Sequence, residues 1–323
     1  MLWRQRVPRS LVRGIYHTLF PTPTRLKRRQ IPLGPDQAAA IRASLDQHYY
    51  QGWRAREHYS DQGFAQHVAM QLQGRVESDR WLIVPWLDAA RPLDGSSVLE
   101  IGCGTGSSTV ALAEQGAQVV GVDVNENALA VARDRARAYR VDAEFRCLNA
   151  NAIASLGRAF DSIIFFASLE HLTVPERLTA LRDAWALLPA GGLLVIVETP
   201  NRLWFYDGHT ALMPFFHWLP DELAFLYSQH SPRENFRELY REINLEQMDH
   251  FLRQGRGVSF HEFDLAIGRH LRVVSSLSTF HGVRYKPQRS FFERRYKSVL
   301  RHIYPNLHPG WCEDTLFLIL VKD

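Results

Sequence analysis

The chain has 323 residues, of which 46% are hydrophobic and 22% are charged, as in a globular protein with one elaborated α/β domain or two small ones. No stretch approaches the roughly 18 apolar residues of a membrane-spanning helix, and the basic N-terminus lacks the apolar segment of a signal peptide. The three cysteines, Cys103, Cys147 and Cys312, have neither disulfide nor metal-ligand spacing, which argues against a secreted, disulfide-stabilised protein and predicts a cytoplasmic location.

Charge is distributed unevenly along the chain. The first 35 residues carry eight Lys or Arg residues and no acid, whereas the remainder has 30 basic and 34 acidic residues. Apolar side chains such as Trp3 and Phe20 lie among these cations, so residues 1–35 are predicted to form a basic arm that contacts an anionic membrane or phosphate groups. A solvated, loosely docked arm and a targeting sequence are the alternatives.

Residues 36–92 are predicted to form helices. The helix expected over residues 79–90 carries apolar side chains that would pack on a sheet. Pro85 interrupts its regularity, because proline lacks the N–H that a helix interior requires.

A glycine-rich turn follows the first predicted strand, which covers residues 98–101. Gly102, Gly104 and Gly106 come next at alternating positions. Glycine lets the backbone turn tightly and lets a ligand lie against it, and the helix predicted over residues 107–115 presents unpaired N–H groups at its N-terminus. The pattern predicts a nucleotide-type site at the carboxyl end of a strand.

The spacing of this turn differs from the G-x-G-x-x-G fingerprint of dinucleotide binding, because Ser107 stands where the third glycine is required. The next predicted strand, residues 118–123, ends in an acid. The Asp123 carboxylate can accept hydrogen bonds from a ribose diol, and a solvated helix N-cap is the alternative. A helix over residues 126–140 is expected to follow.

Further strand and helix patterns continue the alternation. Strands are predicted over residues 143–148, 160–166 and 193–198. Between the last two lies a helix over residues 173–188, opened by the capping-box pair Thr173 and Glu176.

This order of elements resembles the class I S-adenosylmethionine-dependent methyltransferases. Residues 100–106, Glu-Ile-Gly-Cys-Gly-Thr-Gly, are similar to the family's first motif. Residues 167–172, Ala-Ser-Leu-Glu-His-Leu, are similar to the fourth motif of the type 11/12-like branch, which acts on small molecules such as quinone precursors. The resemblance implies S-adenosyl-L-methionine as cofactor. The cofactor-binding residues that it implies are Glu100, Gly102, Cys103, Gly104, Thr105, Gly106, Asp123, Val124, Asn149, Ala150 and Phe166.

The position expected to contact adenine departs from the family's pattern. Asn149 stands where the family usually has an aspartate near the adenine amino group, although it retains an oxygen acceptor. Asn151 is an alternative register for the same contact. Helices before the glycine turn often cover the cofactor in this family, so Arg75 or Tyr59 is a candidate contact of cofactor or substrate. A surface arginine and a core aromatic residue are the alternatives.

The predicted fold is therefore α/β, with a Rossmann-like seven-stranded, mostly parallel sheet and helices on both faces. N-terminal helices precede the sheet, and a helical cap is inserted after the fifth strand. The predicted units are the basic arm (1–35), an N-terminal helical lid (36–92), the cofactor-binding core (93–202), a helical substrate cap (203–257) and the C-terminal part of the sheet with a basic insert (258–323).

The cap begins with an aromatic-rich loop over residues 203–219. Ligands of open α/β sheets bind beyond the carboxyl ends of the strands, where this loop must emerge. The loop therefore predicts a wall of the acceptor pocket, and an aromatic mini-core is the alternative. The candidate acceptor contacts are Trp204, Tyr206, Asp207 and His217. One helix is expected to open at Asp221, and a long one to run from about residue 231 to Gln254.

After the cap, a helix is predicted over residues 260–267, with strands over 271–277 and 315–321. The insert between these strands, residues 281–313, interleaves arginines and lysines with aromatic residues. Such a pattern binds phosphates or nucleic acid in some proteins. An amphipathic surface helix is the alternative.

Methyl transfer to a hydroxyl group requires a base that takes its proton. His171, just after the fourth predicted strand, is the first candidate, and His209 in the cap is the second; each is otherwise structural. Glu170 and His171 also invite a metal site, but Ala167 replaces the acid that relatives carry in this motif. No metal is therefore expected.

The sequence thus predicts a methyltransferase that acts, at oxygen, on a small-molecule or glycan/lipid-linked acceptor. Its location is cytoplasmic, with peripheral membrane contact through the arm. An RNA methyltransferase that uses the basic segments is one alternative, although nucleic acid is a less expected partner. An inactive, cofactor-binding scaffold subunit is the other. The oligomeric state does not follow from the sequence.

Overall fold

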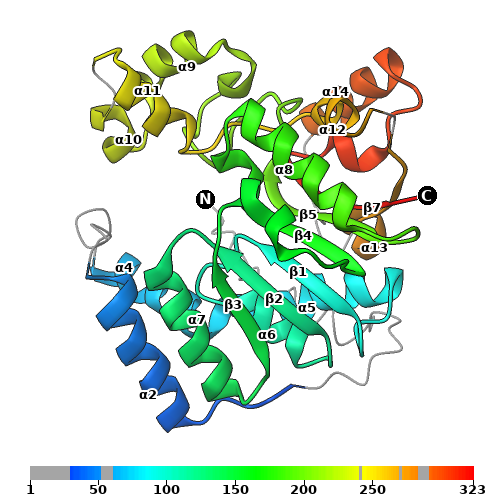
Figure 1. Cartoon of the computed structure of the whole chain (residues 1–323). Helices are drawn as coiled ribbons and strands as arrows, with labels where there is room; N and C mark the ends of the chain where they lie inside the picture. The colour runs from blue at the N-terminus through cyan, green and yellow to red at the C-terminus, as the bar shows by residue number, and fades with distance from the viewer. Residues whose placement is uncertain (1–29, 52–60, 240–241, 269–270, 283–290) are drawn as a thin grey trace, which may run out of the picture.

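The structure, a computed structural model, describes residues 30–51, 61–239, 242–268, 271–282 and 291–323 (Figure 1). Most of the predicted basic arm and the candidate Tyr59 lie outside the described residues. The strands of the sheet are β1 (Ser97–Ile101), β2 (Gln118–Asp123), β3 (Ala143–Cys147), β4 (Ser162–Phe166), β5 (Leu193–Pro200), β6 (Val273–Ser276) and β7 (Thr315–Val321).

The seven strands form one sheet in the order β3-β2-β1-β4-β5-β7-β6. Strands β1 to β5 are parallel to one another, and β7 runs antiparallel to both β5 and β6. The predicted seven-stranded, mostly parallel α/β sheet is thereby confirmed. The order reverses at β1 and β4, so a crevice for a ligand is expected beyond the carboxyl ends of these two strands.

Helices precede, flank and follow this sheet. The N-terminal helices are α2 (Pro35–Ser44), η1 (Leu45–Tyr49), α4 (Asp61–Ala69), η2 (Met70–Gly74) and α5 (Arg75–Ala90). The helices of the parallel part are α6 (Ser107–Ala113), α7 (Glu126–Tyr139), η3 (Ala150–Leu156), η4 (Leu169–His171) and α8 (Val174–Leu187). Those of the cap are η5 (Phe216–Trp218), α9 (Asp221–Tyr227), η6 (Ser228–His230), α10 (Glu234–Leu239) and α11 (Leu245–Leu252), and the last ones are α12 (Phe260–Ile267), α13 (Leu277–His281), α14 (Phe291–Ile303) and η8 (Pro309–Cys312).

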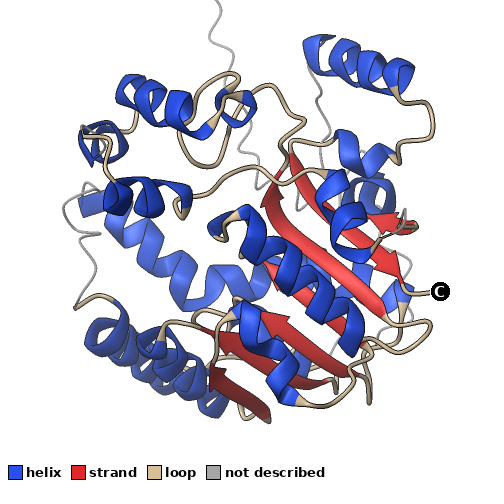
Figure 2. Ribbon diagram, turned by 45° about the horizontal axis from the view of Figure 1, so that its top comes forward, coloured by secondary structure: helices blue, strands red, loops and turns tan. Residues whose placement is uncertain are grey.

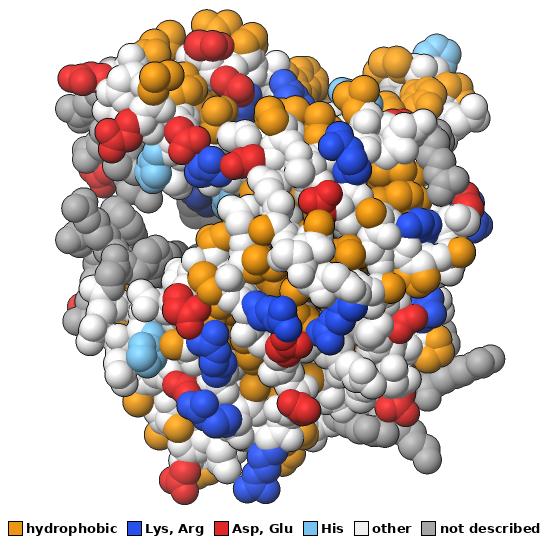
Figure 3. Space-filling model, in the orientation of Figure 1, with side chains coloured by type: hydrophobic (Ala, Val, Ile, Leu, Met, Phe, Trp, Pro, Cys, Tyr) orange, Lys and Arg blue, Asp and Glu red, His pale blue; other side chains and the backbone are white. Residues whose placement is uncertain are grey.

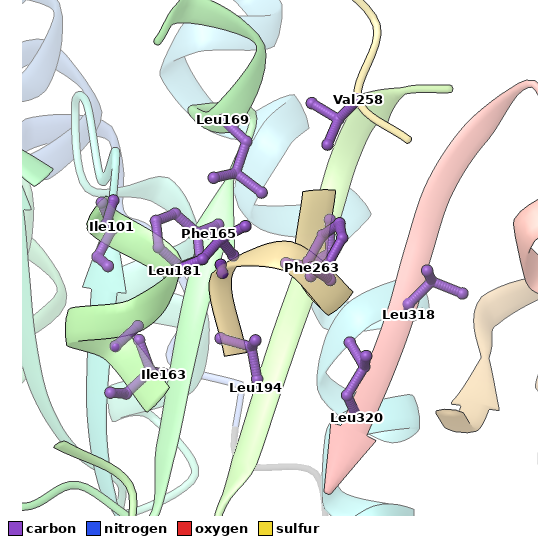
Figure 4. Packing of buried hydrophobic residues seen from close by; sticks show 14 of the residues in the cluster. Ile101, Ile163, Phe165, Leu169, Leu181, Leu194, Val258, Phe263, Leu318 and Leu320 are labelled. Carbon is purple, nitrogen blue, oxygen red and sulfur yellow. The ribbon is translucent and has the colours of Figure 1, made fainter. Parts of the chain in front are cut away.

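Both faces of the sheet are buried beneath helices (Figure 2). Successive side chains of a strand point to opposite faces, and β4 shows the consequence: Ile163 and Phe165 belong to one apolar cluster and Ile164 to the other. The first cluster lies under α8 and α12 (Figure 4), and the second lies under α5, α6 and α7. A strand covered on both faces needs apolar residues at consecutive positions, which is why β4 reads Ser-Ile-Ile-Phe-Phe.

Two predicted helices differ from the structure. The helix predicted over residues 79–90 begins four residues earlier, as α5, and runs through Pro85 without ending. Pro85 and its neighbours Val84 and Trp86 are buried, so packing on the sheet outweighs the lost hydrogen bond.

The long cap helix predicted up to Gln254 is wrong, because the segment forms α10 and α11 instead. Asn244 begins α11 as its N-cap, with its side chain accepting from the Gln247 N–H. An asparagine side chain that bonds the backbone in this way favours a new helix start over the interior of an existing helix.

The strand predicted over residues 271–277 is shorter in the structure. Ser276 ends β6 and caps α13 through hydroxyl and backbone bonds with Thr279. The strand therefore gives way to a helix at a residue type that favours helix N-caps.

Arg135 on α7 joins three separate parts of the chain. Its side chain is fully buried, and its guanidinium donates to the carbonyls of Gln71 and Leu72 in η2 and of Thr105 in the glycine turn, at 2.6, 2.8 and 2.8 Å. Burial lowers the pKa of Arg135 to about 10, so the guanidinium remains charged at neutral pH. Arg135 thus fixes the N-terminal helices against the glycine turn.

We expect Arg135→Met to lower the free energy of unfolding by about 3 to 5 kcal/mol, because three carbonyls lose their charged donor. Chemical denaturation measures this loss. Arg133→Met on the same helix is the matched control, since Arg133 is 38% exposed and pairs with the exposed Glu126; it should change stability by less than about 0.5 kcal/mol. Equal losses in the two variants would contradict the role of Arg135.

Candidate cofactor and acceptor site

The three glycines of the turn after β1 all have positive φ, at +84°, +50° and +77° for Gly102, Gly104 and Gly106. A Cβ at Gly102 would lie 2.7 Å from the Ser168 Cβ, and one at Gly106 would lie 2.8 Å from the Ala132 Cβ. A Cβ at Gly104 would meet nothing within 4 Å. The outer glycines therefore permit close packing, and Gly104 leaves an open surface against which a ligand can lie.

Glu100, two residues before Gly102, stabilises the glycine turn through hydrogen bonds with the start of α6. Its carboxylate is fully buried and accepts hydrogen bonds from the hydroxyls of Ser108 and Thr109 in α6. Burial raises the pKa of Glu100. The side chain thus holds the first turn of α6 in place, and its contact with a cofactor stays a prediction.

Asp123, at the end of β2, fixes the backbone on both sides of the expected ribose position. One carboxylate oxygen accepts from the Gly104 N–H at 2.9 Å, and the other accepts from the Asn125 N–H at 2.8 Å. The helix N-cap of α7 is Asn125, not Asp123. Because a carboxylate has about four acceptor sites, Asp123 retains capacity for a diol.

The two asparagines after β3 have different surroundings. Asn149 is exposed, and its oxygen accepts from the Asn151 N–H at 2.9 Å. The Asn151 side-chain oxygen is buried and has no hydrogen-bond partner among the described residues. A buried acceptor without a donor is costly, so Asn151 is the better placed of the two to accept from a ligand amino group.

The remaining predicted cofactor residues lie at or just after the carboxyl ends of β1 to β4, and their contact with a cofactor stays a prediction. Cys103 is buried against Gly121 of β2, and burial raises the pKa of its thiol, so it is a packing residue of the turn. Thr105 is buried, Val124 is exposed at 66%, and Phe166 and Ala150 are both 8% exposed. The open surface at Gly104 and the unpaired Asn151 oxygen together fit a nucleoside-containing cofactor.

The backbone is strained where β4 and β5 end beside the turn. Ala167 and Glu198 have φ of +43° and +58°, a region that costs side-chain-bearing residues about 1 to 2 kcal/mol each. Glu198 lies at an irregularity in the pairing of β5 with β7, and its side chain is exposed, although burial among neighbouring groups raises its pKa. Strain of this kind concentrates at functional sites.

A buried carboxyl group lies between the two predicted base residues. Glu170 is fully buried, and its Oε1 has no hydrogen-bond partner among the described residues. This oxygen is 3.9 Å from the Nε2 of His171 and 3.9 Å from the Nε2 of His209. The structure therefore brings together two histidines that are far apart in the sequence.

Hydrogen bonds determine which ring nitrogen carries the proton. The His171 Nδ1 is 2.7 Å from the carbonyl of Arg253, so Nδ1 must be the donor. The His209 Nδ1 is 3.1 Å from the Thr210 hydroxyl. That hydroxyl donates its own proton to the Gly255 carbonyl, so here too Nδ1 is the donor. Both Nε2 atoms consequently hold a lone pair beside Glu170.

Burial controls the charge of these groups. The side chains of His171 and His209 are 45% and 42% exposed. Burial of the imidazole nevertheless lowers the pKa of His171. Burial and the neighbouring His171 lower the pKa of His209 to about 4. Burial raises the pKa of Glu170 to about 8. At neutral pH both imidazoles are therefore unprotonated and able to accept a proton. Among the described residues, no set of three His, Cys, Asp or Glu side chains is arranged to hold a metal ion.

Asp207 and His217 are paired inside the cap. Both are 2% exposed, and the His217 Nε2 lies 3.2 Å from Asp207 Oδ1. Asp207 also accepts from the backbone of His209, Thr210 and Ala211, and although burial opposes ionisation, these contacts hold its pKa below the usual range. The pair thus fixes the loop that carries His209, and any direct contact with an acceptor stays a prediction.

The cap loop contains both a small core and an exposed aromatic surface. Phe216 is buried in a cluster with Phe225 and Phe251, which confirms an aromatic mini-core. Trp204 is buried as well, against Phe205 and Tyr296. The other aromatic side chains of the loop, Tyr206, Phe215 and Trp218, are 42%, 50% and 44% exposed.

The sequence pointed to Glu170 only as a metal ligand, which the loss of the acid at Ala167 argued against, and it gave no site role to Glu198. The only local signal for Glu170 was an acid directly before His171, and its burial depends on Thr199 and on the cap, which are distant in the sequence. Nothing in the sequence marks the left-handed backbone of Glu198. Arg75, a candidate ligand contact, begins α5, and its charge acts on both Asp79 and Glu198.

A protein-family model described as a methyltransferase domain matches residues 98–192, from β1 to the start of β5. This part of the chain belongs to the class I S-adenosylmethionine-dependent methyltransferases. The chain is 37% identical over 122 residues to the ubiquinone biosynthesis O-methyltransferase of Pseudomonas entomophila and 35% identical over 136 residues to that of Ruegeria pomeroyi. These matches cover 38% and 42% of this chain and 51% of each relative, so the chain spans about half the length of the curated relatives that it matches.

Solved structures show partial similarity. The magnesium protoporphyrin IX methyltransferase of Synechocystis PCC 6803 with bound SAH has 25% sequence identity and a TM-score of 0.38, over 52% of this chain and 74% of that chain. An amino pentose methyltransferase from Micromonospora echinaspora has 27% identity and a TM-score of 0.35, over 43% and 56%.

The glycine turn yields a paired prediction. Gly104→Ala should lower the affinity for S-adenosylmethionine by at least about ten-fold while reducing stability by only about 1 to 2 kcal/mol, the cost of its backbone conformation. Gly106→Ala should lower the free energy of unfolding by about 3 kcal/mol or more, because the added Cβ also collides with Ala132. Isothermal titration calorimetry and chemical denaturation separate the two effects. Unchanged affinity in a folded Gly104→Ala variant would place the cofactor elsewhere.

Glu170 yields a prediction about pH. Because its pKa is raised to about 8, the folded protein binds this proton more tightly than the unfolded chain, and stability falls as the pH rises from about 5 to about 8. Glu170→Gln cannot ionise, so its stability relative to wild type should increase over this range by more than about 1.4 kcal/mol. Denaturation at several pH values measures the difference.

Glu176→Gln is the control of opposite sign. Burial opposes ionisation of Glu176, but Arg253 and the Thr173 backbone lower its pKa. Relative to wild type, this variant should therefore lose stability as the pH rises from acid to about 5 and show no further change from about 5 to about 8. A pH-independent difference for Glu170→Gln would mean that Glu170 is not protonated in the folded state.

Proposed function

We propose that this chain transfers the methyl group of S-adenosylmethionine to an oxygen atom of a small-molecule or glycan/lipid-linked acceptor. The observation that carries the proposal is the pair of Nε2 lone pairs of His171 and His209 on either side of Glu170. This group lies beside the glycine turn, because the Ser168 hydroxyl donates to the Ile101 carbonyl at 3.1 Å. The relatives named as O-methyltransferases support an oxygen acceptor.

The cofactor would lie along the carboxyl ends of β1 and β2. In this arrangement Gly104 provides the open backbone surface, Asp123 accepts from the ribose hydroxyls, and the unpaired oxygen of Asn151 accepts from the adenine amino group. Cys103, Thr105 and Ala150 shape the same surface without offering a charged group.

When bound, S-adenosylmethionine supplies a methyl group on a sulfonium sulfur; the acceptor oxygen bonds to this carbon as the carbon–sulfur bond breaks and its electron pair stays on sulfur. Because the methyl group is already activated, the protein mainly has to orient the acceptor and remove its proton. The Nε2 of His171 or His209 takes that proton. The resulting imidazolium would lie 3.9 Å from Glu170 Oε1, where the positive charge favours the carboxylate form of Glu170.

The surroundings of the histidines favour an acceptor with an apolar or aromatic part. Tyr206 is half-exposed in the same loop as His209, and Phe215 and Trp218 follow on the surface of the cap. A lipid-linked or flat acceptor would bury against such side chains. The basic arm of residues 1–35 would add attraction for an anionic acceptor or membrane.

The test uses S-adenosylmethionine labelled on the methyl group, incubated with the protein and a cell extract separated into small-molecule, lipid/glycan, RNA and protein fractions. We expect label in the small-molecule or lipid/glycan fraction and none with Asp123→Ala. His171→Gln and His209→Gln should lower the rate, by about 100-fold or more for the residue that takes the proton. His230→Gln, which is exposed in the cap, is the matched control and should leave the rate unchanged.

The other outcomes lead to the alternatives. Label in RNA, with binding that weakens steeply with salt, would indicate an RNA methyltransferase. Cofactor binding without label in any fraction would favour a scaffold subunit. Full activity in both histidine variants would refute proton transfer to these residues.

A further inference from the structure

Helix α14 presents a row of apolar side chains to solvent. Phe292, Val299 and Ile303 are spaced by seven and four residues, so they lie on one side of the helix, and they are 60%, 46% and 73% exposed. Phe291, at the start of the helix, is 77% exposed. Exposed apolar residues in a continuous row mark an interaction surface more often than scattered ones do.

Arg295, three residues after Phe292, lies beside this row, whereas Arg294 and Arg301 lie on the opposite side of the helix. Arg294, Arg295 and Arg301 are exposed on α14, whereas Lys297 points inward, is buried and pairs with Glu313. Tyr296 lies next to the apolar row, four residues after Phe292, and its hydroxyl donates to the Leu203 carbonyl. The helix is therefore held on the protein through Tyr296 and Lys297, and its exposed surface carries both the apolar groups and the arginines.

The apolar row continues onto the cap. The ring of Phe292 lies 4.9 Å from that of Phe205, and Tyr296 stacks on Trp218 at 6.3 Å. Trp218 in turn contacts Phe215 at 5.1 Å. In Figure 1, α14 lies at the upper right beside the cap, and Figure 3 shows hydrophobic side chains gathered there.

We propose that this surface, formed by α14 together with Phe215 and Trp218, docks the protein on an anionic lipid bilayer, with α14 lying in the plane of the headgroups. A helix with aromatic and aliphatic groups on one side, and arginines at the edge and on the opposite side, matches the two layers of a membrane interface, because the apolar side chains reach the acyl chains and the cations meet the lipid phosphates. A second copy of the chain would bring like charges together across a two-fold axis. Nucleic acid would leave Val299 and Ile303 without an apolar partner.

Docking of this kind would bring the cap loop of residues 203–219 to the membrane. His209 and Phe215 belong to the same loop, whose two sides are joined by the bridge between Tyr206 and Pro214. An acceptor embedded in lipid would then leave the bilayer close to His209. This lipid-binding role is separate from methyl transfer, because the binding of the surface to lipid requires neither cofactor nor acceptor.

The experiment measures binding of the full chain to vesicles by co-sedimentation, with vesicles of phosphatidylcholine alone and of phosphatidylcholine mixed with phosphatidylglycerol. We expect binding to the mixed vesicles that weakens with salt. Phe291→Ser/Ile303→Ser should lower the partition coefficient by about ten-fold or more, because two exposed apolar groups no longer enter the membrane. Leu245→Ser is the matched control, since Leu245 is 92% exposed on α11, outside this surface.

A second variant tests the surface by gain of binding. Ile303→Trp should strengthen the partition, because tryptophan prefers the membrane interface. Circular dichroism checks that each variant is folded. Equal vesicle binding by wild type and both α14 variants would assign lipid contact to another segment, such as the basic arm, and would overturn the proposal. A preference of the protein for RNA over vesicles would overturn it as well. Neither result would bear on methyl transfer, which the labelling experiment tests separately.

Discussion

The buried guanidinium of Arg135 is the interaction on which the cofactor side of this structure depends. It satisfies two carbonyls of η2 and one carbonyl of the glycine turn, groups that have no other charged donor at these distances among the described residues. A second arginine, Arg80, binds Glu114 at the end of α6 and the Ile31 carbonyl. Because arginine keeps its charge even when buried, these two side chains add to the apolar packing that holds the N-terminal helices over the first strands of the sheet.

A second constraint acts where β1 and β4 end side by side. Close packing of Gly102 against Ser168 leaves no space for a side chain, so the segment after β4 must turn sharply, and Ala167 adopts a left-handed conformation. This turn directs Glu170 inward and His171 outward. The packing that closes the glycine turn therefore also orients the residues proposed to handle the proton, which explains how cofactor and acceptor sites come to share one edge of the sheet.

The cap completes the site from the other side. The buried Asp207 and His217 pair holds the loop so that His209 faces Glu170, and the carbonyl of Arg253 in the same cap fixes the tautomer of His171. The cap is thus required for the state of both histidines. Its outer aromatic side chains continue onto α14, so the proposed acceptor site and the proposed lipid surface share a common support, and an acceptor dissolved in a membrane would fit both.

Local patterns in the sequence determined the order of strands and helices, the glycine turn, and the positions of Asp123 and His171, because alternation, helix caps and glycine spacing depend on neighbouring residues. The number of strands and the mostly parallel sheet also followed from that order. Only the tertiary structure decided that Glu170 is buried between His171 and His209, that Asp207 and His217 face one another, and that Asn151 rather than Asn149 holds an unpaired oxygen. It also split the predicted long cap helix into α10 and α11. These features depend on contacts between segments that are far apart in the chain, and on the desolvation that such contacts impose, neither of which has a signature in the local sequence.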